Sequence, residues 1–479
     1  MLHPFIGRKR ELQMLRDLFK KKSASLVVMR GRRRIGKSRL AQEFALPNRH
    51  HVFSGIPPTS STSAAAQREE FARQIQREMN IPMPRADDWG DLFWCLAQQV
   101  QKGKVVLVLD EISWMGSKDS EFLGKLKIAW DLYFKKNPQL VLILCGSISS
   151  WIEKNILSST GFMGRISLDI VLEELALHEC NEFWNAEQSK VSAFDKLKVL
   201  SVTGGVPRYL EEILPSQSAE TNIQRLCFQK EGFLFSEFER IFSDLFSTRS
   251  AIYKKIVKRL ARGPCELKDI YDALGVGKGG VISDYMEDLV TAGFVSRDFT
   301  WHLKTGEDSK LNQYRLKDNY LRFYLKYIEP NKKKIDKQAL KLPPQWQSII
   351  GLQFENLVLC NRKSIQQILG IDPSEIINDN PFFQPSAQGQ SGCQIDYLIQ
   401  TKFGTCYLCE IKFFSREITN SVVDEVKQKM RHLQLPRGLS IRPVLIHVNG
   451  IDDSVLESDF FASIIDFESL LMNRSTHCG

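Results

Sequence analysis

The sequence predicts an α/β protein with several domains, and three observations support this fold class. Apolar runs at residues 26–29, 104–109 and 139–144 have the continuous hydrophobic character of strands buried on both faces of a parallel sheet. Segments with apolar residues three and four positions apart follow such runs, which is typical of helices that alternate with strands. The chain has 479 residues, more than one hydrophobic core usually organises, so we expect roughly two to four domains.

The composition indicates an ordinary folded protein that is moderately basic and has free cysteines. Hydrophobic residues make up 43% of the chain, as in ordinary folded proteins, and the net charge of +9 is consistent with an anionic partner such as DNA. Ten cysteines, several inside apolar runs, indicate free thiols in a reducing cytosol. Cys406 and Cys409 stand three positions apart in a strand pattern, so they point to opposite faces and cannot readily share a metal ion.

The sequence shows no membrane signal. No stretch approaches the roughly 20 apolar residues that cross a bilayer. Residues 1–7 lead directly into a charged helix pattern rather than a signal peptide. We therefore expect a cytoplasmic protein without a membrane partner.

The strongest motif is a glycine-rich loop that directly follows the first apolar run. It fits the phosphate-loop pattern G-x-x-x-x-G-K-[ST], and its residues are Gly31, Arg32, Arg33, Arg34, Ile35, Gly36, Lys37 and Ser38. The glycines allow backbone N–H groups to converge on phosphates at a helix N-terminus. Lys37 would reach the β- and γ-phosphates, and the Ser38 hydroxyl would be a ligand of Mg²⁺. A plain turn needs neither side chain, so the motif predicts binding of ATP with Mg²⁺.

Two acids end the second apolar run. The carboxyl ends of parallel strands meet at the ligand-binding edge of such a sheet, which places Asp110 and Glu111 beside the phosphate loop. We interpret Asp110 as a ligand of Mg²⁺ and Glu111 as the group that polarises the attacking water. Residues 5–8, just before the first helix pattern, are typical of a segment beside the adenine base, which makes Arg8 a nucleotide-binding candidate. A plain core helix there is compatible with this interpretation.

Two further residues leave alternatives open. Ser147 ends the third apolar run, where it would sense the γ-phosphate or the water, or cap a helix that starts near Ser149. Arg165 directly precedes a strand pattern at residues 166–170. It would project at the nucleotide of a neighbouring subunit as an arginine finger, or form a surface ion pair.

Taken in order, these motifs resemble those of a known family. The sequences FIGR, GRRRIGKS, VVLVLDE, LCGS, GR before a strand, and TGGVPRYL at residues 203–210 resemble the archaeal-type ATPases of the AAA+/STAND lineage. The resemblance covers about the first half of the chain. It implies an ATPase core over residues 1–170 and a helical lid over residues 171–245. It also implies that Arg208 lies near the position where related ATPases place a second sensor arginine, and it is compatible with a homo-oligomer.

Residues 246–330 predict a winged helix. Three helix patterns occupy residues 252–260, 267–274 and 281–290, and short strands follow at residues 293–296 and 311–316. The third helix, with Lys278 before it, would be the recognition helix in a DNA complex. Asp284, Glu287 and Asp288 on that helix would repel phosphates, so use as a packing module is equally compatible.

The C-terminal region, residues 346–479, follows a basic linker at residues 331–345 and carries charged residues on predicted elements. Glu355 lies on a helix pattern, and Asp396 lies near the start of a strand pattern. Glu410 and Lys412 are two apart on the next strand, and therefore on the same face. Charges on an apolar strand are costly unless they face a metal, a partner or solvent.

This arrangement resembles the PD-(D/E)XK nuclease superfamily, in the nuclease-like domain that often follows archaeal-type ATPases. The resemblance implies that Asp396 and Glu410 bind Mg²⁺, that Lys412 orients the attacking water, and that Glu355 adds an acid. Ile395 stands where the motif has proline. The alternative is a binding or dimerising module that does not cleave.

Downstream, a helix pattern carries basic residues on its polar face, which would contact phosphates or face solvent: Lys427, Lys429 and Arg431. His447 ends a strand pattern and is expected to be structural.

The complete expectation is an α/β protein with a P-loop AAA+-type core, a helical lid, a winged helix and a C-terminal restriction-endonuclease-like domain. It would bind and hydrolyse ATP, bind DNA and cleave it with Mg²⁺. The alternative is an ATP-driven switch or regulator that binds DNA or a protein partner through the winged helix, with a nuclease-like domain that does not cleave.

Overall fold

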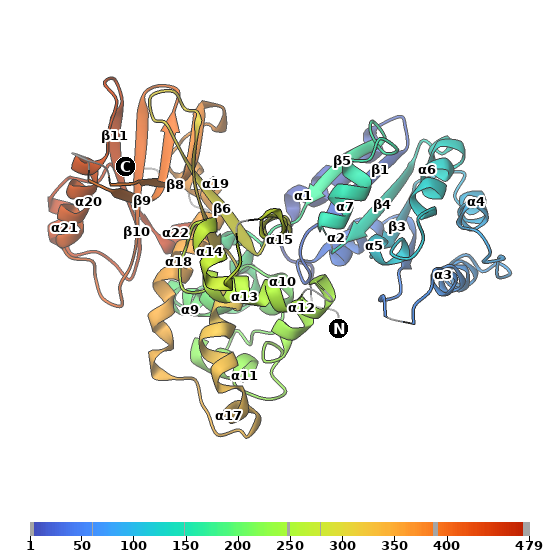
Figure 1. Cartoon of the computed structure of the whole chain (residues 1–479), viewed down its shortest axis with the longest axis horizontal. Helices are drawn as coiled ribbons and strands as arrows, with labels where there is room; N and C mark the ends of the chain where they lie inside the picture. The colour runs from blue at the N-terminus through green and yellow to red at the C-terminus, as the bar shows by residue number, and fades with distance from the viewer. Residues whose placement is uncertain are drawn as a thin grey trace. The chain divides into compact units, whose positions relative to one another are not determined.

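The computed structural model describes residues 4–59, 61–147, 149–246, 250–277, 279–386 and 391–472. The chain divides into two compact units (Figure 1). The first consists of Met1–Glu173 with Thr291–Gly293, and the second of Glu174–Val290 with Phe294–Gly479. Each is described by itself.

The first unit is built on a parallel sheet of five strands in the order β2-β3-β4-β1-β5. The strands are β1 (Ser25–Arg30), β2 (Arg49–Ser54), β3 (Val105–Asp110), β4 (Leu140–Gly146) and β5 (Ile166–Val171). β1, β3 and β4 match the three predicted apolar runs, and β5 matches the strand pattern at residues 166–170. The sequence patterns did not predict β2, because this edge strand carries arginine and two histidines where a central strand would be apolar.

Helices cover both faces of this sheet (Figure 1). One face packs on α1 (Lys9–Asp17) and α2 (Lys37–Ala45) through apolar side chains such as Leu15, Leu40 and Phe44. The other packs on α3 (Ala64–Met79), α4 (Trp89–Gln99) and α6 (Phe122–Leu132) through a cluster of aromatic rings. Shorter elements complete the unit: η1 (Leu18–Lys20), α5 (Ile112–Met115), η2 (Phe134–Lys136), α7 (Ser149–Ile152) and η3 (Glu153–Leu157). Burial of both faces explains why its central strands are apolar throughout.

The second unit begins with a helical region. Its elements are α8 (Leu177–Asn181), η4 (Glu182–Glu187), α9 (Ala193–Thr203), α10 (Pro207–Leu210), α11 (Ala219–Cys227) and α12 (Glu237–Phe246). Three helices and an antiparallel hairpin follow: α13 (Ser250–Leu260), α14 (Leu267–Leu274), α15 (Gly280–Thr291), β6 (Val295–Trp301) and β7 (Asp308–Leu316). These are the element types that the sequence predicts for a winged helix. Lys278 lies outside the described residues.

The hairpin is packed into the core of the C-terminal sheet rather than standing apart. Trp301 and Leu303 are buried there, and the Trp301 ring lies 5.2 Å from the ring of Phe382. Trp301 Nε1 donates to Gln400 Oε1 at 2.6 Å, and Gln400 Nε2 donates to the Leu303 carbonyl at 2.8 Å. Residues on both sides of the predicted linker at residues 331–345 therefore share one core.

The predicted basic linker is also partly helical. Lys332–Asp336 form α17, and Ile335 is buried while Lys333 and Lys334 face solvent. The neighbouring elements are α16 (Asn319–Phe323), η6 (Tyr324–Ile328), η7 (Glu329–Asn331) and η8 (Pro344–Ile349).

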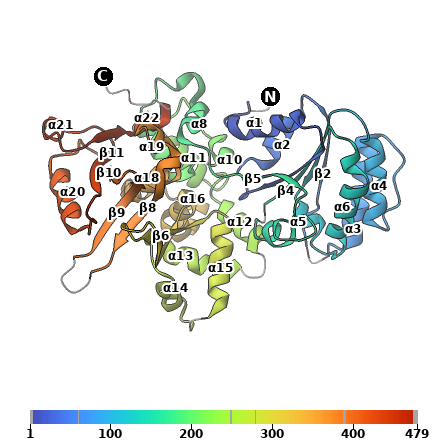
Figure 2. The ribbon, with the colours of Figure 1, turned by 90° about the horizontal axis from the view of Figure 1, so that it is seen from above.

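A second, mixed sheet of five strands forms the C-terminal part, in the order β12-β11-β10-β9-β8. Its strands are β8 (Ile376–Gln384), β9 (Cys393–Thr401), β10 (Thr405–Phe413), β11 (Ser440–Val448) and β12 (Ser463–Asp466). Its helices are α18 (Ile350–Cys360), α19 (Arg362–Ile368), η9 (Pro373–Glu375), α20 (Ser421–His432), α21 (Asp453–Glu457) and α22 (Phe467–Met472). α20 and α21 flank one side of the strands, and α18 and α22 the other (Figure 2).

Candidate functional site

The phosphate loop joins β1 to α2 with a backbone that requires glycine. Gly36, the residue before α2, has φ 91°, and Gly31 has φ 148°. A Cβ atom on Gly31 would lie 2.4 Å from the Leu172 carbonyl oxygen, which leaves no room for a side chain. The backbone N–H groups of the loop thus lie next to the N-terminus of α2, a helix of nine residues. Together they form an arrangement suited to binding an anion.

Lys37 is buried and folded back over this loop. Its Nζ donates to the carbonyl oxygens of Gly31 at 2.8 Å and Arg32 at 3.0 Å. Burial lowers the pKa of Lys37, and the negative charges of Glu111 and Asp110 oppose that effect. Its ammonium group therefore lies at the loop, where a phosphate would be held.

The structure brings together the two side chains that the sequence predicts as Mg²⁺ ligands. Ser38 Oγ donates to Asp110 Oδ2 at 2.6 Å. Asp110 ends β3 and Ser38 lies in the first turn of α2, so they meet at the carboxyl edge of the sheet. One hydroxyl and one carboxylate oxygen form a hard donor pair that suits Mg²⁺.

Glu111 is paired with Ser147. Ser147 Oγ donates to Glu111 Oε2 at 2.9 Å, and the Ser147 backbone N–H donates to the same oxygen at 3.4 Å. Burial raises the pKa of Glu111, and the nearby Lys37 opposes that effect. Ser147 thus lies beside Glu111, and its predicted role in sensing the γ-phosphate or the water stays a prediction.

Three predicted arginines have partners within the protein. Arg8 is buried and donates to the backbone carbonyl of Ile35 at 3.1 Å and to that of Glu173. It therefore links the phosphate loop to the segment that follows β5. Arg165 donates to both carboxylate oxygens of Asp131 at 2.9 Å, which is the ion-pair alternative.

Arg208 belongs to the second unit. It forms ion pairs with Glu211 at 3.1 Å and Glu212 at 2.6 Å, and its guanidinium lies 4.6 Å from the centre of the Phe233 ring. Its predicted role as a sensor therefore stays a prediction.

The second candidate site lies on β9 and β10. Tyr397 pairs with Cys409 in the antiparallel ladder, so the next residues, Asp396 and Glu410, lie side by side on the face toward α20. The Ile411 backbone N–H donates to Asp396 Oδ2 at 2.9 Å. Burial first, and the charge of Glu410 second, raise the pKa of Asp396.

Two lysines contact Glu410, one at each oxygen. Lys412 Nζ lies 3.1 Å from Oε1, which agrees with the predicted common face, and Lys429 Nζ lies 2.6 Å from Oε2. Lys412 also donates to Glu425 Oε2 at 2.6 Å, and Lys429 Nζ is 4.0 Å from Asp396 Oδ1. A cavity of about 510 Å³ adjoins the cluster and is lined by Asp396, Glu425 and Lys429 among others.

Sequence reasoning placed Lys429 on a polar helix face and missed its role at the carboxylates. The signal was available, because Val422, Val426 and Lys429 lie at i, i+4 and i+7, on the helix face that packs against the sheet. Within the part of the chain that the structure describes, no group of three or more His, Cys, Asp or Glu side chains is arranged to hold a metal ion.

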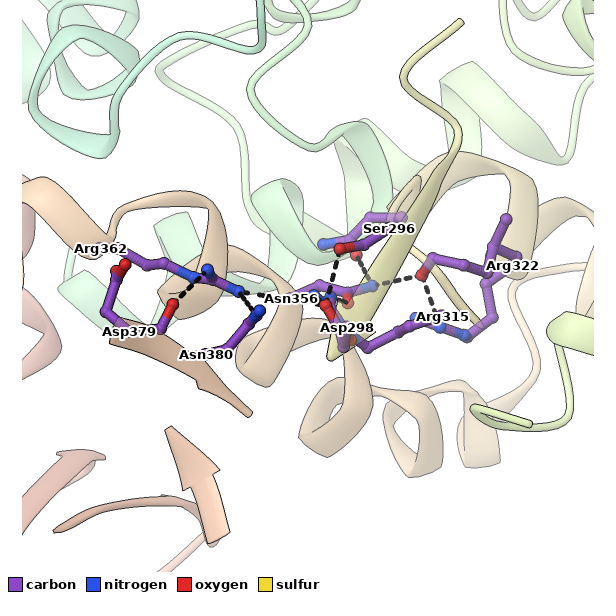
Figure 3. A network of polar contacts seen from close by, with 10 residues as sticks. Ser296, Asp298, Arg315, Arg322, Asn356, Arg362, Asp379 and Asn380 are labelled. Carbon is purple, nitrogen blue, oxygen red and sulfur yellow. Dashed lines mark hydrogen bonds and ion pairs between the residues drawn. The ribbon is translucent and has the colours of Figure 1, made fainter. Parts of the chain in front are cut away.

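A buried polar network that sequence reasoning did not predict joins β6, β7 and α18 (Figure 3). Arg315 forms a bidentate ion pair with Asp298, at 2.7 and 3.1 Å, and also donates to Asn356. Arg322 donates to Gln353 at 2.6 Å.

Burial raises the pKa of Glu355, while the charges of Arg315 and Arg322 oppose it. Glu355 is also one of the charges that raise the pKa of Asp396. The charge of Glu355 therefore interacts both with the arginines of the network and with Asp396.

Comparison with known proteins identifies the first region. Residues 5–213 match the family described as "ATPase domain predominantly from Archaea". An uncharacterized protein of Methanocaldococcus jannaschii, MJECL04, is 24% identical over 358 residues, which cover 74% of this chain and 76% of that protein.

A solved structure shows the same class of fold. A Walker-type ATPase of Pyrococcus abyssi covers 67% of this chain and 96% of its own, with a TM-score of 0.51 and 17% identity. The ORC2 protein of Aeropyrum pernix is 14% identical and covers 76% of this chain and 98% of its own, with a TM-score of 0.40. Among the described residues, no helix is long and apolar enough to cross a membrane. Residues 5–213 thus match a family of ATPase domains found predominantly in Archaea, and the Pyrococcus abyssi structure shows the same fold.

Proposed function

We propose that this protein is an ATP-regulated, Mg²⁺-dependent DNA endonuclease. Its first unit would bind and hydrolyse ATP, and the carboxylates on β9 and β10 would cleave DNA. The observation that carries the proposal is that Asp396, which lines the cavity, lies beside Glu410 on the neighbouring strand, where Lys412 contacts Glu410. Residues 5–213 of the same chain match an ATPase family.

In the ATPase unit each side chain has a separate task. Lys37, fixed by two backbone carbonyls, would exchange these contacts for the β- and γ-phosphates. Ser38 and Asp110 would hold Mg²⁺, which when bound offsets phosphate charge. Glu111 would accept a hydrogen bond from the attacking water, and the Ser147 hydroxyl keeps its carboxylate in place.

In the C-terminal site, Asp396 and Glu410 would hold Mg²⁺, which when bound activates water and offsets charge at the scissile phosphate. The donor chemistry fits, because two adjacent carboxylates already share one cationic group, the ammonium of Lys429. Lys412 lies on the same strand face as Glu410 and would orient the water and stabilise the charged transition state.

We assign DNA contact to the C-terminal domain rather than to α15. Asp284 and Glu287 are exposed on α15, where they would repel phosphates. A truncated chain that lacks the C-terminal sheet would expose Trp301 and Leu303, so DNA binding is best measured on the full chain.

Lys412→Ala is expected to reduce nicking of supercoiled plasmid by roughly 10²-fold while ATP hydrolysis stays unchanged, because Lys412 lies at the carboxylates and not at the phosphate loop. Nicking is measured with Mg²⁺ and with Mn²⁺, with and without ATP. Lys37→Ala, run in parallel, is expected to abolish ATP turnover and to remove the effect of ATP on nicking. Lys402→Ala, at an exposed lysine between β9 and β10, is the matched control. Equal nicking by wild type and Lys412→Ala would refute the assignment.

An ATP-driven switch that does not cleave is the second candidate. The observation that favours it is the Lys429 ammonium, which contacts both carboxylates and offsets part of their charge. Intact ATP hydrolysis without nicking by the wild-type protein would support the switch, with the C-terminal domain as a docking module for DNA or a protein.

A further inference from the structure

Lys429 lies where two carboxylates share one cation. Its Nζ is 2.6 Å from Glu410 Oε2 and 4.0 Å from Asp396 Oδ1. The Glu410 side chain is only 1% exposed, whereas Lys429 is 26% exposed. Lys429 thus lines the cavity and contacts the Glu410 carboxylate, which is nearly inaccessible to solvent.

The other cations near Glu410 do not replace this contact. Lys412 is shared between Glu410 and the more exposed Glu425, at 3.1 and 2.6 Å. Asp396 receives one backbone N–H, from Ile411. An uncompensated buried carboxylate is strongly unfavourable. Lys412 offsets the charge of Glu410 alone, whereas the Lys429 ammonium lies within ion-pair distance of both Glu410 and Asp396 and so stabilises the two side by side.

We infer that Lys429 is an intramolecular counter-ion that competes with a divalent cation for the position between Asp396 and Glu410. This inference rests on the proposed function, because it takes these two carboxylates as the metal ligands. Both cations need the same carboxylate oxygens, so Lys429 must release Glu410 before a divalent ion binds. The released ammonium stays beside the cavity, where it meets an anionic substrate rather than solvent alone.

The helix supplies the geometry of this competition. Glu425 and Lys429 are one turn apart on α20, so Glu425 contacts Lys412 while Lys429 contacts Glu410. The two ion pairs together hold α20 on β10. Lys427, two positions before Lys429, instead places its ammonium 5.4 Å from the centre of the Phe460 ring, away from the carboxylates.

The test is the Mn²⁺ affinity of the nucleotide-free, full-length Lys429→Met protein, measured by calorimetry. Methionine keeps the length and apolar stem of the side chain without its charge. We expect Mn²⁺ to bind roughly tenfold more tightly than to wild type, because an ion pair no longer has to be broken. We also expect a lower Tm in metal-free buffer, and a larger rise in Tm on addition of Mn²⁺ than in wild type.

Controls separate this site from the phosphate loop and from general effects of charge. Asp396→Asn is expected to abolish the Mn²⁺ signal assigned to this site, and Lys427→Met is expected to bind Mn²⁺ like wild type. Lys429→Gln keeps a hydrogen-bond donor for Glu410 and gives the same comparison if the methionine variant does not fold.

Plasmid nicking by the same wild-type preparation separates the two ideas. Unchanged or weaker Mn²⁺ binding by Lys429→Met overturns the counter-ion role even if wild type cleaves DNA. Tighter binding without any cleavage by wild type supports the counter-ion role and refutes the nuclease. Absence of an Asp396-dependent Mn²⁺ signal in both proteins overturns both.

Discussion

Glu111→Gln is expected to lower the rate of ATP hydrolysis by about 10³-fold and to leave ATP affinity nearly unchanged. The amide keeps the size of the carboxylate and still accepts a hydrogen bond from Ser147, but it cannot take up a proton from water. Burial already holds the pKa of Glu111 above its usual value, which makes this carboxylate a better base than an exposed one.

The measurement pairs steady-state phosphate release with binding of a fluorescent ATP analogue. Glu121→Gln is a matched control, because this carboxylate belongs to the same unit and its side chain is 73% exposed. Loss of ATP affinity in Glu111→Gln would assign Glu111 to binding instead of the chemical step. Hydrolysis at the wild-type rate would exclude Glu111 as the water-polarising group.

The second large effect is on stability. Arg315→Met is expected to lower the free energy of unfolding of the second unit by about 3–5 kcal/mol, because it leaves the Asp298 carboxylate buried without its bidentate ion pair. Both side chains are nearly inaccessible, at 6% and 5% exposed. The change also removes the donor to Asn356 on α18, so the hairpin and that helix lose a direct link.

The ion pair also predicts a dependence on pH. Burial by itself raises the pKa of Asp298, but the charge and hydrogen bonds of Arg315 outweigh it, so the net shift is downward. A lowered folded-state pKa contributes stability that is present above the pKa of the unfolded chain and is lost as pH falls through the folded-state value. The stability difference between wild type and Arg315→Met should therefore shrink as the pH is lowered below about 4.

Denaturant unfolding combined with hydrogen exchange of peptides from residues 295–316 measures this effect where it arises. Arg297→Met is the control, because Arg297 is exposed on the same strand as Asp298. A loss of stability equal in the two variants, or one that does not change with pH, would contradict the role assigned to the buried pair.

The features that the sequence determined depend on short spacings. The phosphate loop, the apolar strands that end in Asp110 and Ser147, and the common face of Glu410 and Lys412 all follow from residues close together in the chain. Strand alternation, helix periodicity and the backbone freedom of glycine act locally, so a pattern of a few residues is enough to predict them.

The features that only the tertiary structure decided join distant residues. Trp301 on the hairpin pairs with Gln400, and Arg315 reaches Asn356 on α18. Lys429 contacts Glu410 where α20 packs on the sheet. The edge strands β2, β8 and β12 carry polar residues, and these segments form strands because they pair with a neighbouring strand rather than because they are hydrophobic. The residues next to a charged side chain in the sequence do not indicate its partner. The partner is determined by which elements pack together and by how much water that packing removes.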